Sequence, residues 1–397
     1  MVTDPVKYRL KQAMGIIPED WDIDEIQNHA DITTGAKNTQ DRIEDGKFPF
    51  FVRSQKIERI NTYSYDGESV LTAGDGVGTG KVFHYINGKF DFHQRVYSIS
   101  NFDNCLEGYF FYLYFSSHFL ARIMSMTAKS SVDSVRRDMI AEMLIPLPEK
   151  NEQIAISTTM KDIIELIETI NKTIEKKKSI KQGAMQELLT GKRRLEGFDG
   201  EWIEDFLGLL LLLLKDGTHN PPKRISKGIP LLASENIHDG EIDFEKSSSY
   251  ISEQDYKELQ KQYHISKMDL LLTIVGTIGR VSLVKQESKF SVQRSVAILR
   301  ANNRISPQFL YFIIQSYTFQ LQLQLNKNAT AQSGIYLNSL SKIKLFFPKM
   351  VTEQEKIAEI LFDMDSEIKE LEAKKDKYIM IKNGMMQKLL TGEIRLT

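Results

Sequence analysis

The chain has 397 residues, of which 41% are hydrophobic and 26% charged, and its formal net charge is −1. This length allows two or three domains with cores of their own, in an ordinary globular composition. A single cysteine, Cys105, excludes an intramolecular disulfide and a cysteine-based zinc site, and is typical of a reducing compartment. We expect a cytoplasmic protein without a membrane partner, because residues 1–15 are polar and the longest apolar run, residues 206–214, is about half of a membrane span.

Residues 1–147 predict a first globular domain of mixed helices and strands. Alternating apolar and polar runs at residues 48–53 and 68–72 indicate strands. Residues 106–123 are rich in aromatic side chains and indicate a buried helix.

Residues 148–194 predict a long helix that is repeated at the end of the chain. Residues 152–191 match residues 353–392 at 15 of 40 positions without a gap, which indicates a tandem duplication. Apolar residues recur at alternating intervals of four and three, the heptad rhythm of helices packed along one another. The predicted seam consists of Ile156, Met160, Ile163, Ile167, Ile170 and Ile174 in the first copy and of Ile357, Leu361, Met364, Ile368 and Leu371 in the second.

Residues 195–347 repeat the plan of the first domain more loosely, and residues 348–397 contain the second long helix. A strand is expected at residues 228–232 and an aromatic helix at residues 309–317. Each long helix could instead be an ordinary helix of a globular domain. The return of the heptad rhythm in register favours a packed pair of rods, each about 55 Å long.

No catalytic or cofactor motif stands out. The glycine-rich loop before Lys81 is not a P-loop, because Asp75 replaces its first glycine and Val82 its serine or threonine. The acidic pair and lysine within residues 365–369 lie in the heptad helix, where charges are expected to face solvent. The seven histidines lack metal-ligand spacing, and no dinucleotide fingerprint is present. The sequence therefore predicts a binder without cofactor or metal, and not an enzyme.

Polar side chains in the two globules could bind DNA. Gln, Asn and Arg can hydrogen-bond base edges, and Lys and Arg can grip phosphates, whereas an exposed polar side chain is usually only solvated surface. A Gln-Arg pair occurs in both globules, and its arginine could instead clamp neighbouring loops. The candidates are Lys81, His93, Gln94, Arg95, Lys129 and Ser130 in the first globule, and His219, Asn220, Lys223, Arg224, Arg280, Gln293, Arg294, Gln332 and Ser333 in the second.

The order globule, helix, globule, helix resembles the specificity subunits of type I restriction and modification systems over essentially the whole chain. The motifs that carry the resemblance are the Glu-Gln pairs after Pro148 and Pro348, the twin heptad helices with their Leu-Leu-Thr-Gly ends, Trp21, Trp202 and Asp216-Gly217-Thr218-His219. Two features depart from the family pattern. These are the six leucines at residues 209–214 and, in the first globule, Thr33-Thr34-Gly35-Ala36-Lys37 in place of the Asp-Gly-Thr-His turn.

The resemblance implies an α+β protein in which two α/β target recognition domains are joined by two long helices that form an antiparallel coiled coil, a pseudo-twofold tandem repeat. Such subunits recognise a bipartite, asymmetric site on double-stranded DNA and have no activity of their own. Their partners are two methylation subunits, which use adenosylmethionine, and motor-nuclease subunits, which use ATP and magnesium. By analogy, the lysine-rich residues 176–181 and the Leu-Leu-Thr-Gly ends are candidate docking surfaces.

Two rival functions belong to other classes. The first is a protein-interaction scaffold with coiled-coil arms, which would show no DNA affinity at any salt concentration. The second is a standalone nuclease or methylase, which the missing motifs disfavour. If the rods set the distance between two DNA-reading globules, their length predicts an unread gap of roughly five to eight base pairs.

Overall fold

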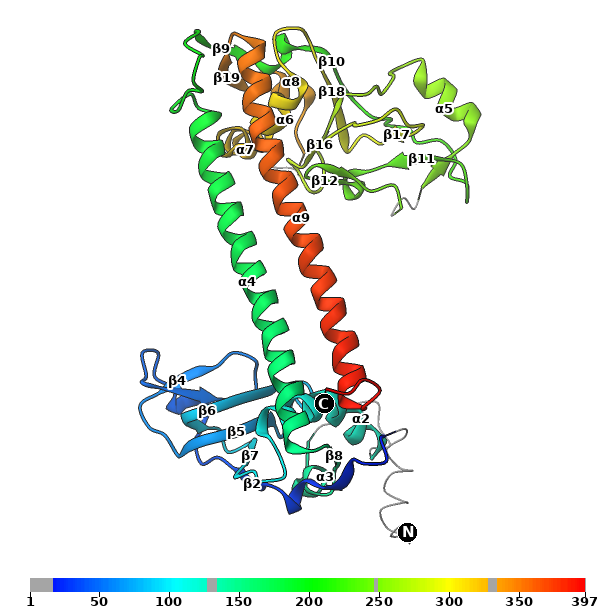
Figure 1. The fold of residues 1–397 in the computed structure, drawn as a ribbon. Helices are drawn as coiled ribbons and strands as arrows, with labels where there is room; N and C mark the ends of the chain where they lie inside the picture. Colours follow the sequence, from blue (N-terminus) through cyan, green and yellow to red (C-terminus); the bar gives the residue numbers. More distant parts are fainter. Residues whose placement is uncertain (1–16, 127–133, 246–248, 328–333, 397) are drawn as a thin grey trace. The chain divides into compact units, whose positions relative to one another are not determined.

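The computed structural model describes residues 17–126, 134–245, 249–327 and 334–396 (Figure 1). The chain divides into two compact units, of which the first comprises Met1–Asn171 with Ala373–Thr397 and the second Lys172–Glu372. Within the described ranges, no helix is both long enough and apolar enough to cross a lipid bilayer.

The first unit contains a six-stranded sheet in the order β2-β7-β5-β6-β3-β4 and a separate pair, β1 with β8. All neighbouring strands are antiparallel except β3 and β6, which run parallel. The strands are β1 (Asp22–Glu25), β2 (Asp31–Thr34), β3 (Phe48–Phe51), β4 (Glu58–Ile60), β5 (Tyr65–Ala73), β6 (Phe83–Phe92), β7 (Val96–Ser100) and β8 (Leu144–Leu147). The helical segments are η1 (Ile26–Asn28), η2 (Thr39–Asp41), α2 (Gly108–Ser125) and α3 (Arg137–Ala141).

The helix α2 forms the centre of the first unit's core, which confirms the buried aromatic helix expected at residues 106–123. It begins where the Glu107 side chain accepts a hydrogen bond from the Phe110 N–H, a typical N-cap. Phe111, Phe115 and Phe119 stack along one face with ring centroids 5.2 and 4.4 Å apart. This face packs with the sheet, because α2 contacts β5 and β6.

The second unit is built from smaller sheets with the orders β10-β18-β15-β16, β14-β11-β17, β12-β13 and β19-β9. The strands are β9 (Trp202–Phe206), β10 (Leu211–Asp216), β11 (Ile229–Leu232), β12 (Ile237–His238), β13 (Glu241–Ile242), β14 (Tyr250–Ile251), β15 (Leu270–Thr273), β16 (Val281–Leu283), β17 (Ser291–Val292), β18 (Val296–Ala301) and β19 (Lys344–Pro348). The helical segments are η3 (Leu207–Leu210), η4 (Ser234–Asn236), α5 (Glu253–Gln260), α6 (Pro307–Gln315), α7 (Tyr317–Leu325) and α8 (Leu337–Ser341).

The aromatic helix of the second unit differs from its expected bounds. Instead of one helix at residues 309–317, α6 ends at Gln315 and α7 begins at Tyr317. Ser316 separates them, because its backbone is extended (φ −63°, ψ 149°) and its hydroxyl caps α7 by accepting from the Phe319 N–H. A serine favours such a cap over the interior of a continuous helix.

The six leucines at residues 209–214 are divided between η3 and the edge strand β10. Leu211 pairs with Ala301 and Leu213 with Arg300, so Leu212 is an extra residue in a bulge. Leu212 is therefore 72% exposed, and Leu209 in η3 is 60% exposed. The run is thus a turn and a bulged strand rather than one apolar strand.

Two long helices, α4 (Lys150–Leu188) and α9 (Val351–Leu390), cross the division between the units. In the second unit, Lys177 pairs with Glu367 and Lys181 with Asp365. The partner's number falls as the number along α4 rises, so these segments run antiparallel.

The predicted seam residues near the start of each helix pack into globular cores. Ile156, Met160 and Ile163 join the core of the first unit, and Ile357 and Leu361 join that of the second. Farther along α4, Ile170 and Ile174 are also buried, whereas Ile167 is half-buried. Farther along α9, Ile368 is buried, whereas Met364 and Leu371 are half-buried. The early seam positions thus stabilise a globule and do not serve a helix pair alone.

The repeated Glu-Gln pairs anchor the start of each long helix. In both units the buried glutamine side chain donates to the carbonyl oxygen of the preceding proline and to a loop carbonyl, and accepts from a loop N–H. The partners are Pro148, Cys105 and Glu107 for Gln153, and Pro348, Arg304 and Ser306 for Gln354.

The glutamates of these pairs form two equivalent clasps, each from one glutamate, one arginine and one tryptophan. The first clasp is Glu152 with Arg395 and Trp21, and the second is Glu353 with Arg194 and Trp202. Each arginine follows the end of one long helix and each glutamate lies at the start of the other. The clasps therefore tie opposite ends of α4 and α9 together in their units.

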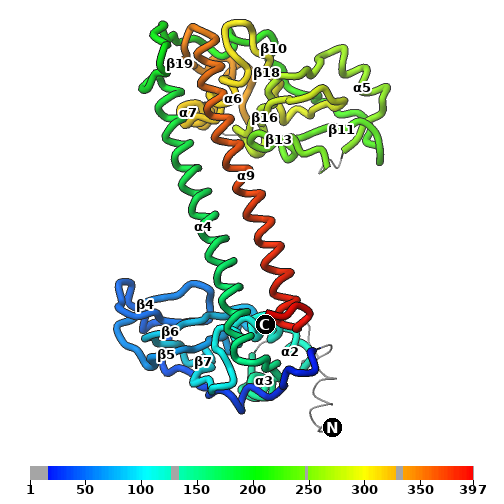
Figure 2. The backbone as a smooth tube through the Cα atoms, in the orientation of Figure 1, coloured from blue at the N-terminus to red at the C-terminus, as the bar shows by residue number. Residues whose placement is uncertain are grey.

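The Leu-Leu-Thr-Gly ends lie inside the units. Leu188 and Leu189 belong to the core of the second unit, and Leu389 and Leu390 to that of the first, where α9 ends beside α2 (Figure 2). Gly191 and Gly392 adopt φ of +69° and +71°, a left-handed helix end that favours glycine. The leucines are at most 5% exposed and so offer no apolar docking surface, whereas the threonine and glycine of each end are half-buried.

Acid should weaken the first clasp. Burial raises the pKa of Glu152, but hydrogen bonds from Arg395 and Trp21 outweigh burial and hold that pKa below its ordinary value of 4.5. A carboxylate whose pKa is lowered by folding contributes stability above its unfolded pKa and loses that contribution as pH falls through the folded value. We expect the free energy of unfolding to fall below about pH 4.5, and to fall less steeply in the Glu152→Gln variant, measured by urea unfolding at a series of pH values.

Candidate nucleic-acid interface

Polar side chains of the first unit gather where strands of the six-stranded sheet end. Gly35 follows β2 so close to β6 that a Cβ there would lie 2.0 Å from the Phe92 carbonyl oxygen, so only glycine is tolerated. This approach lets Lys37 form a parallel bridge with His93, and its carbonyl accepts from the Gln94 N–H. The turn between β6 and β7 is thereby fixed against the chain that leaves β2.

The second unit builds the same turn from different residues. A Cβ on Gly217 would lie 2.1 Å from the Val292 carbonyl oxygen, Thr218 bridges Gln293, and the Thr218 carbonyl accepts from the Arg294 N–H. Gly35 thus has the role of Gly217, and the first unit does not lack this turn. The two turns differ in sequence and by one residue in length, because the bridging residue Lys37 lies two positions after Gly35, whereas Thr218 directly follows Gly217.

The two Gln-Arg pairs are not equivalent. The Val96 N–H donates to the carbonyl oxygen of His93, and the Val296 N–H donates to that of Gln293. Equivalent positions of the two turns are therefore 200 residues apart, whereas the two Gln-Arg pairs are 199 residues apart. His93-Gln94-Arg95 therefore corresponds to Gln293-Arg294-Ser295. The repeated pair is a coincidence of sequence, and the turns present different side chains.

Three charged side chains form a cluster at this edge of the first unit, which we call the Arg-Asp-Arg trio: Arg53, Asp75 and Arg95. Asp75 Oδ1 accepts from Arg53 at 2.7 Å, and Oδ2 accepts from Arg95 at 2.6 Å. Burial raises the pKa of Asp75, but the hydrogen bonds from the two guanidinium groups outweigh burial and lower that pKa. Arg95 thus pairs with a neighbouring loop, while its side chain stays 61% exposed. Arg53 and Asp75 are not among the candidates predicted from the sequence, although Arg53 ends a predicted strand and Asp75 lies in the glycine-rich loop.

The remaining candidates of the first unit differ in exposure. His93 is only 5% exposed, and its Nδ1 accepts from the Arg95 N–H. Burial and the charges of Arg53 and Arg95 lower the pKa of His93, which favours the neutral ring. Gln94 is exposed and donates to Asn38 Oδ1 at 2.7 Å, and Lys81 is exposed. Lys129 and Ser130 lie outside the described residues.

In the second unit the candidates lie in two groups. His219 pairs with Asp216 at 2.6 Å in the turn after β10, and the backbone carbonyl of Asn220 accepts a hydrogen bond from the Thr218 hydroxyl there. Arg224 and Gln293 line a polar cavity of about 230 Å³. The exposed side chains of Arg294 and Lys223 have no ion-pair partner among the described residues. Arg280 is half-buried in the turn between β15 and β16, and Gln332 and Ser333 lie outside the described residues.

Residues 18–177 and 224–379 match the family model described as the type I restriction modification DNA specificity domain. The chain belongs to this family. The two matched ranges fall one on each half of the tandem repeat, which confirms the resemblance drawn from the sequence.

Relatives of this specificity-family chain are named as specificity subunits. The MjaVIII specificity subunit of Methanocaldococcus jannaschii is 26% identical over 96% of this chain and 94% of its own length. The EcoBI specificity subunit of Escherichia coli is 23% identical over 76% of this chain and 68% of its own length. The family supports a role in DNA sequence specificity, and these names agree with the expectation of a specificity subunit and not an enzyme.

The fold is also shared with a solved structure of the same family. The type I restriction-modification S subunit of M. genitalium superposes with a TM-score of 0.64 at 18% identity, covering 94% of this chain and 96% of that one. At this identity the likeness shows the fold alone.

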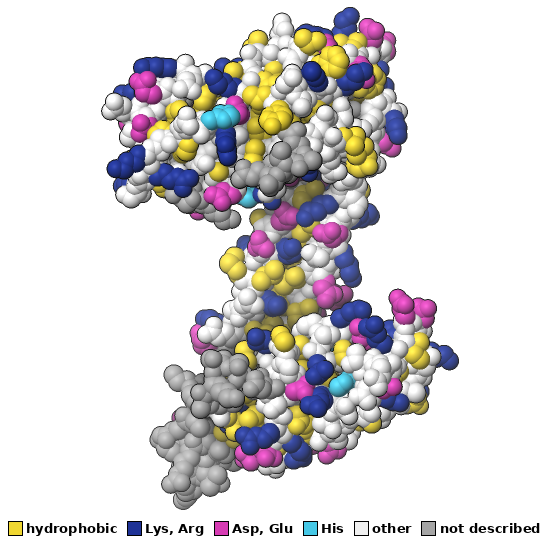
Figure 3. Space-filling view, turned by 180° about the vertical axis from the view of Figure 1, so that it is seen from behind, with side chains coloured by type: hydrophobic (Ala, Val, Ile, Leu, Met, Phe, Trp, Pro, Cys, Tyr) yellow, Lys and Arg dark blue, Asp and Glu magenta, His cyan; other side chains and the backbone are white. Residues whose placement is uncertain are grey.

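On the face that Figure 3 draws, the charges are mixed rather than segregated. Basic and acidic side chains are interspersed on the face of each unit in Figure 3. Among the described residues, no group of three or more His, Cys, Asp or Glu side chains could hold a metal ion.

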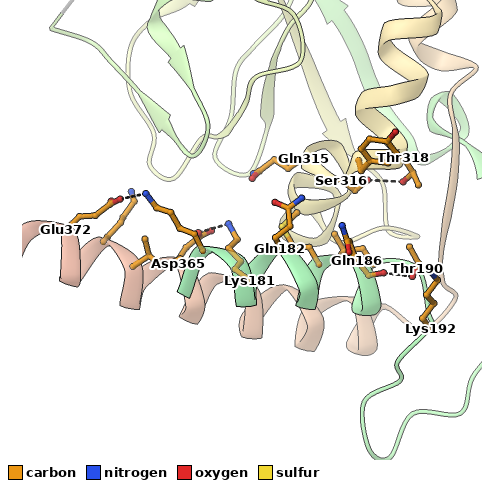
Figure 4. A pocket seen from close by; sticks show the side chains of 16 residues that line it. Lys181, Gln182, Gln186, Thr190, Lys192, Gln315, Ser316, Thr318, Asp365 and Glu372 are labelled. Carbon is orange, nitrogen blue, oxygen red and sulfur yellow. Dashed lines mark hydrogen bonds and ion pairs between the residues drawn. The ribbon is translucent and has the colours of Figure 1, made fainter. Parts of the chain in front are cut away.

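A groove of about 640 Å³ lies in the second unit beside the C-terminal part of α4. Lys181, Gln182 and Gln186 of α4 form one wall, residues 315–318 at the junction of α6 and α7 another, and α9 contributes Asp365 and Glu372 (Figure 4). Lys181 pairs with Asp365 and Lys178 with Glu372. The lysines predicted as a docking surface thus belong partly to ion pairs between the two helices.

Proposed function

We propose that this chain is the sequence-specific DNA-binding subunit of a type I restriction-modification complex and recognises a bipartite, asymmetric DNA site. The supporting observation is that both units build the same glycine-dependent turn but place different side chains on it, His93-Gln94-Arg95 in one and Gln293-Arg294-Ser295 in the other. Equivalent backbones with unlike polar groups are suited to two half-sites of different sequence.

We propose the division expected from the sequence as the functional one. Residues 1–147 and 195–347 are the target recognition domains, and residues 148–194 and 348–397 carry the spacer helices. Helices of 39 and 40 residues have a length of roughly 60 Å at 1.5 Å per residue. As an antiparallel coiled coil with pseudo-twofold symmetry, they set the number of unread base pairs between the half-sites.

The proposed partners perform the chemistry. Two methylation subunits use adenosylmethionine, and motor-nuclease subunits use ATP and magnesium. Because the Leu-Leu-Thr-Gly leucines are buried, docking falls to exposed polar positions such as residues 176–181 and the neighbouring groove.

Methylome mapping tests this proposal. A cell carrying this chain with its methylation subunits should show one methylated motif made of two unlike half-sites and a gap of fixed length. Purified complex should bind that site with an affinity that falls roughly a thousandfold between 50 and 200 mM salt. The purified chain alone should neither cleave nor methylate DNA. A scaffold without DNA binding, the rival function, predicts no motif and no affinity at any salt concentration.

A further inference from the structure

The Arg-Asp-Arg trio comes from three separate segments that meet where interior strands of the first unit's sheet end. Arg53 follows β3, Asp75 follows β5, and Arg95 lies in the turn from β6 to β7. The carboxylate is only 16% exposed, whereas the side chains of Arg53 and Arg95 are 43% and 61% exposed. The negative charge thus lies beneath two positive groups that face solvent.

The geometry leaves most guanidinium donors available. Asp75 contacts NH1 of each arginine, and among the described residues neither guanidinium has another partner. A guanidinium has five N–H donors in a rigid planar fork, so each arginine keeps donors for a ligand. The carboxylate fixes both forks before a ligand arrives, which removes much of the cost of ordering two long side chains.

The equivalent positions of the second unit are neutral. The Phe51 carbonyl accepts from the N–H of His93, and the Leu232 carbonyl accepts from the N–H of Gln293, so Phe51 corresponds to Leu232. Two residues farther on, Arg53 therefore corresponds to Ser234. Asp75 corresponds to Val275, because Asp75 forms an antiparallel bridge with Ser134 and Val275 forms the equivalent bridge with Gly334. Arg95 corresponds to Ser295, as shown above. A trio that served only to hold the shared fold would not be expected to vanish from the other copy, so its role belongs to the first unit.

We propose that Arg53 and Arg95, oriented by Asp75, recognise guanine in the half-site bound by the first unit. This inference rests on the proposed DNA-binding function. A guanidinium fork matches the O6 and N7 acceptors of guanine in the major groove, the commonest specific contact between arginine and a base. A phosphate is bound more tightly by a lysine or arginine without an acidic neighbour, because a carboxylate at the same place repels the phosphate. Asp75 is therefore a positioning residue.

Selection from random duplexes by the full chain in complex with its methylation subunits tests the inference. We expect wild type to select at least one G·C pair in the first half-site. Arg53→Lys or Arg95→Lys, which keep the charge but lose the fork, should lower the preference for that guanine roughly tenfold or more. Arg42→Lys is the matched control, because Arg42 pairs with Glu58 at 3.7 Å outside the trio, and should change no base preference.

The Asp75→Asn variant tests whether Asp75 orients the two arginines or only stabilises the first unit. It removes one negative charge, so binding to random DNA should be retained or strengthened while the guanine preference falls, with the second half-site selected as before. Uniform weakening at all sequences with the guanine preference intact would assign the arginines to phosphate and overturn the inference, as would a half-site without guanine. If wild type selects no motif, the proposed function fails, and the inference with it.

Discussion

Replacing Arg194 by alanine is expected to destabilise the second unit by about 3 kcal/mol. Arg194 donates through Nε and one terminal nitrogen to the two carboxylate oxygens of Glu353, at 2.8 and 2.9 Å. The Glu353 side chain is fully buried, and among the described residues the substitution would leave its carboxylate only the hydrogen bond from the Trp202 indole N–H, at 3.3 Å. Removing one partner of a buried ion pair costs far more than the intact pair contributes, because an uncompensated charge remains.

Urea unfolding, followed by circular dichroism, measures this loss. Arg395→Ala should have a comparable effect on the first unit, where Glu152 is likewise buried and is bound by Arg395 through two hydrogen bonds. Lys289→Ala is the control, since the pair of Lys289 with Glu253 is exposed on both sides and should contribute little. An Arg194→Ala protein as stable as wild type would contradict the assignment of the clasps as structural anchors.

Replacing Gly217 by alanine is expected to cost about 1–3 kcal/mol or more and to abolish recognition by the second unit. The new Cβ would lie 2.1 Å from the Val292 carbonyl oxygen and 2.5 Å from that of Gln293. Both neighbours are backbone atoms that cannot rotate away, so the strand ends must separate. The turn that presents Gln293 and Arg294 would then lose its support.

The matched control is Gly183→Ala in α4, where a Cβ meets nothing within 4 Å. Alanine is the better helix former by up to about 1 kcal/mol, so this variant should be as stable as wild type or more so. In selection from random duplexes, Gly217→Ala should lose the preference for one half-site and retain the other. Loss of both preferences, or of neither, would contradict the proposal that each unit reads one half.

The duplicated motifs diverge according to what each residue contacts. The Glu-Gln pairs and the Leu-Leu-Thr-Gly ends bind the same kinds of partner in both units, namely a tryptophan, an arginine, a proline carbonyl and a buried core. A change in either motif would break a buried contact. The positions of the Arg-Asp-Arg trio and its neutral counterpart are more exposed, so they are free to differ and to specify different half-sites.

The sequence by itself determined the features that depend on local periodicity and on duplication. The heptad spacing predicted both long helices, and the aromatic run predicted α2, because the side chains that share a face of a helix recur every three or four residues. The in-register match of residues 152–191 and 353–392 predicted the tandem repeat. These signals lie within one segment and need no knowledge of what packs against it.

Only the tertiary structure decided which distant residues meet. Glu152 and Arg395 are 243 positions apart, and the members of the Arg-Asp-Arg trio come from three strand ends. For the same reason, the sequence suggested that the two Gln-Arg pairs are equivalent, which they are not, and did not show that Gly35 corresponds to Gly217. Partners across a sheet or between helix ends are selected by the packing of whole elements, and a linear pattern of residue types does not encode that packing in any one place.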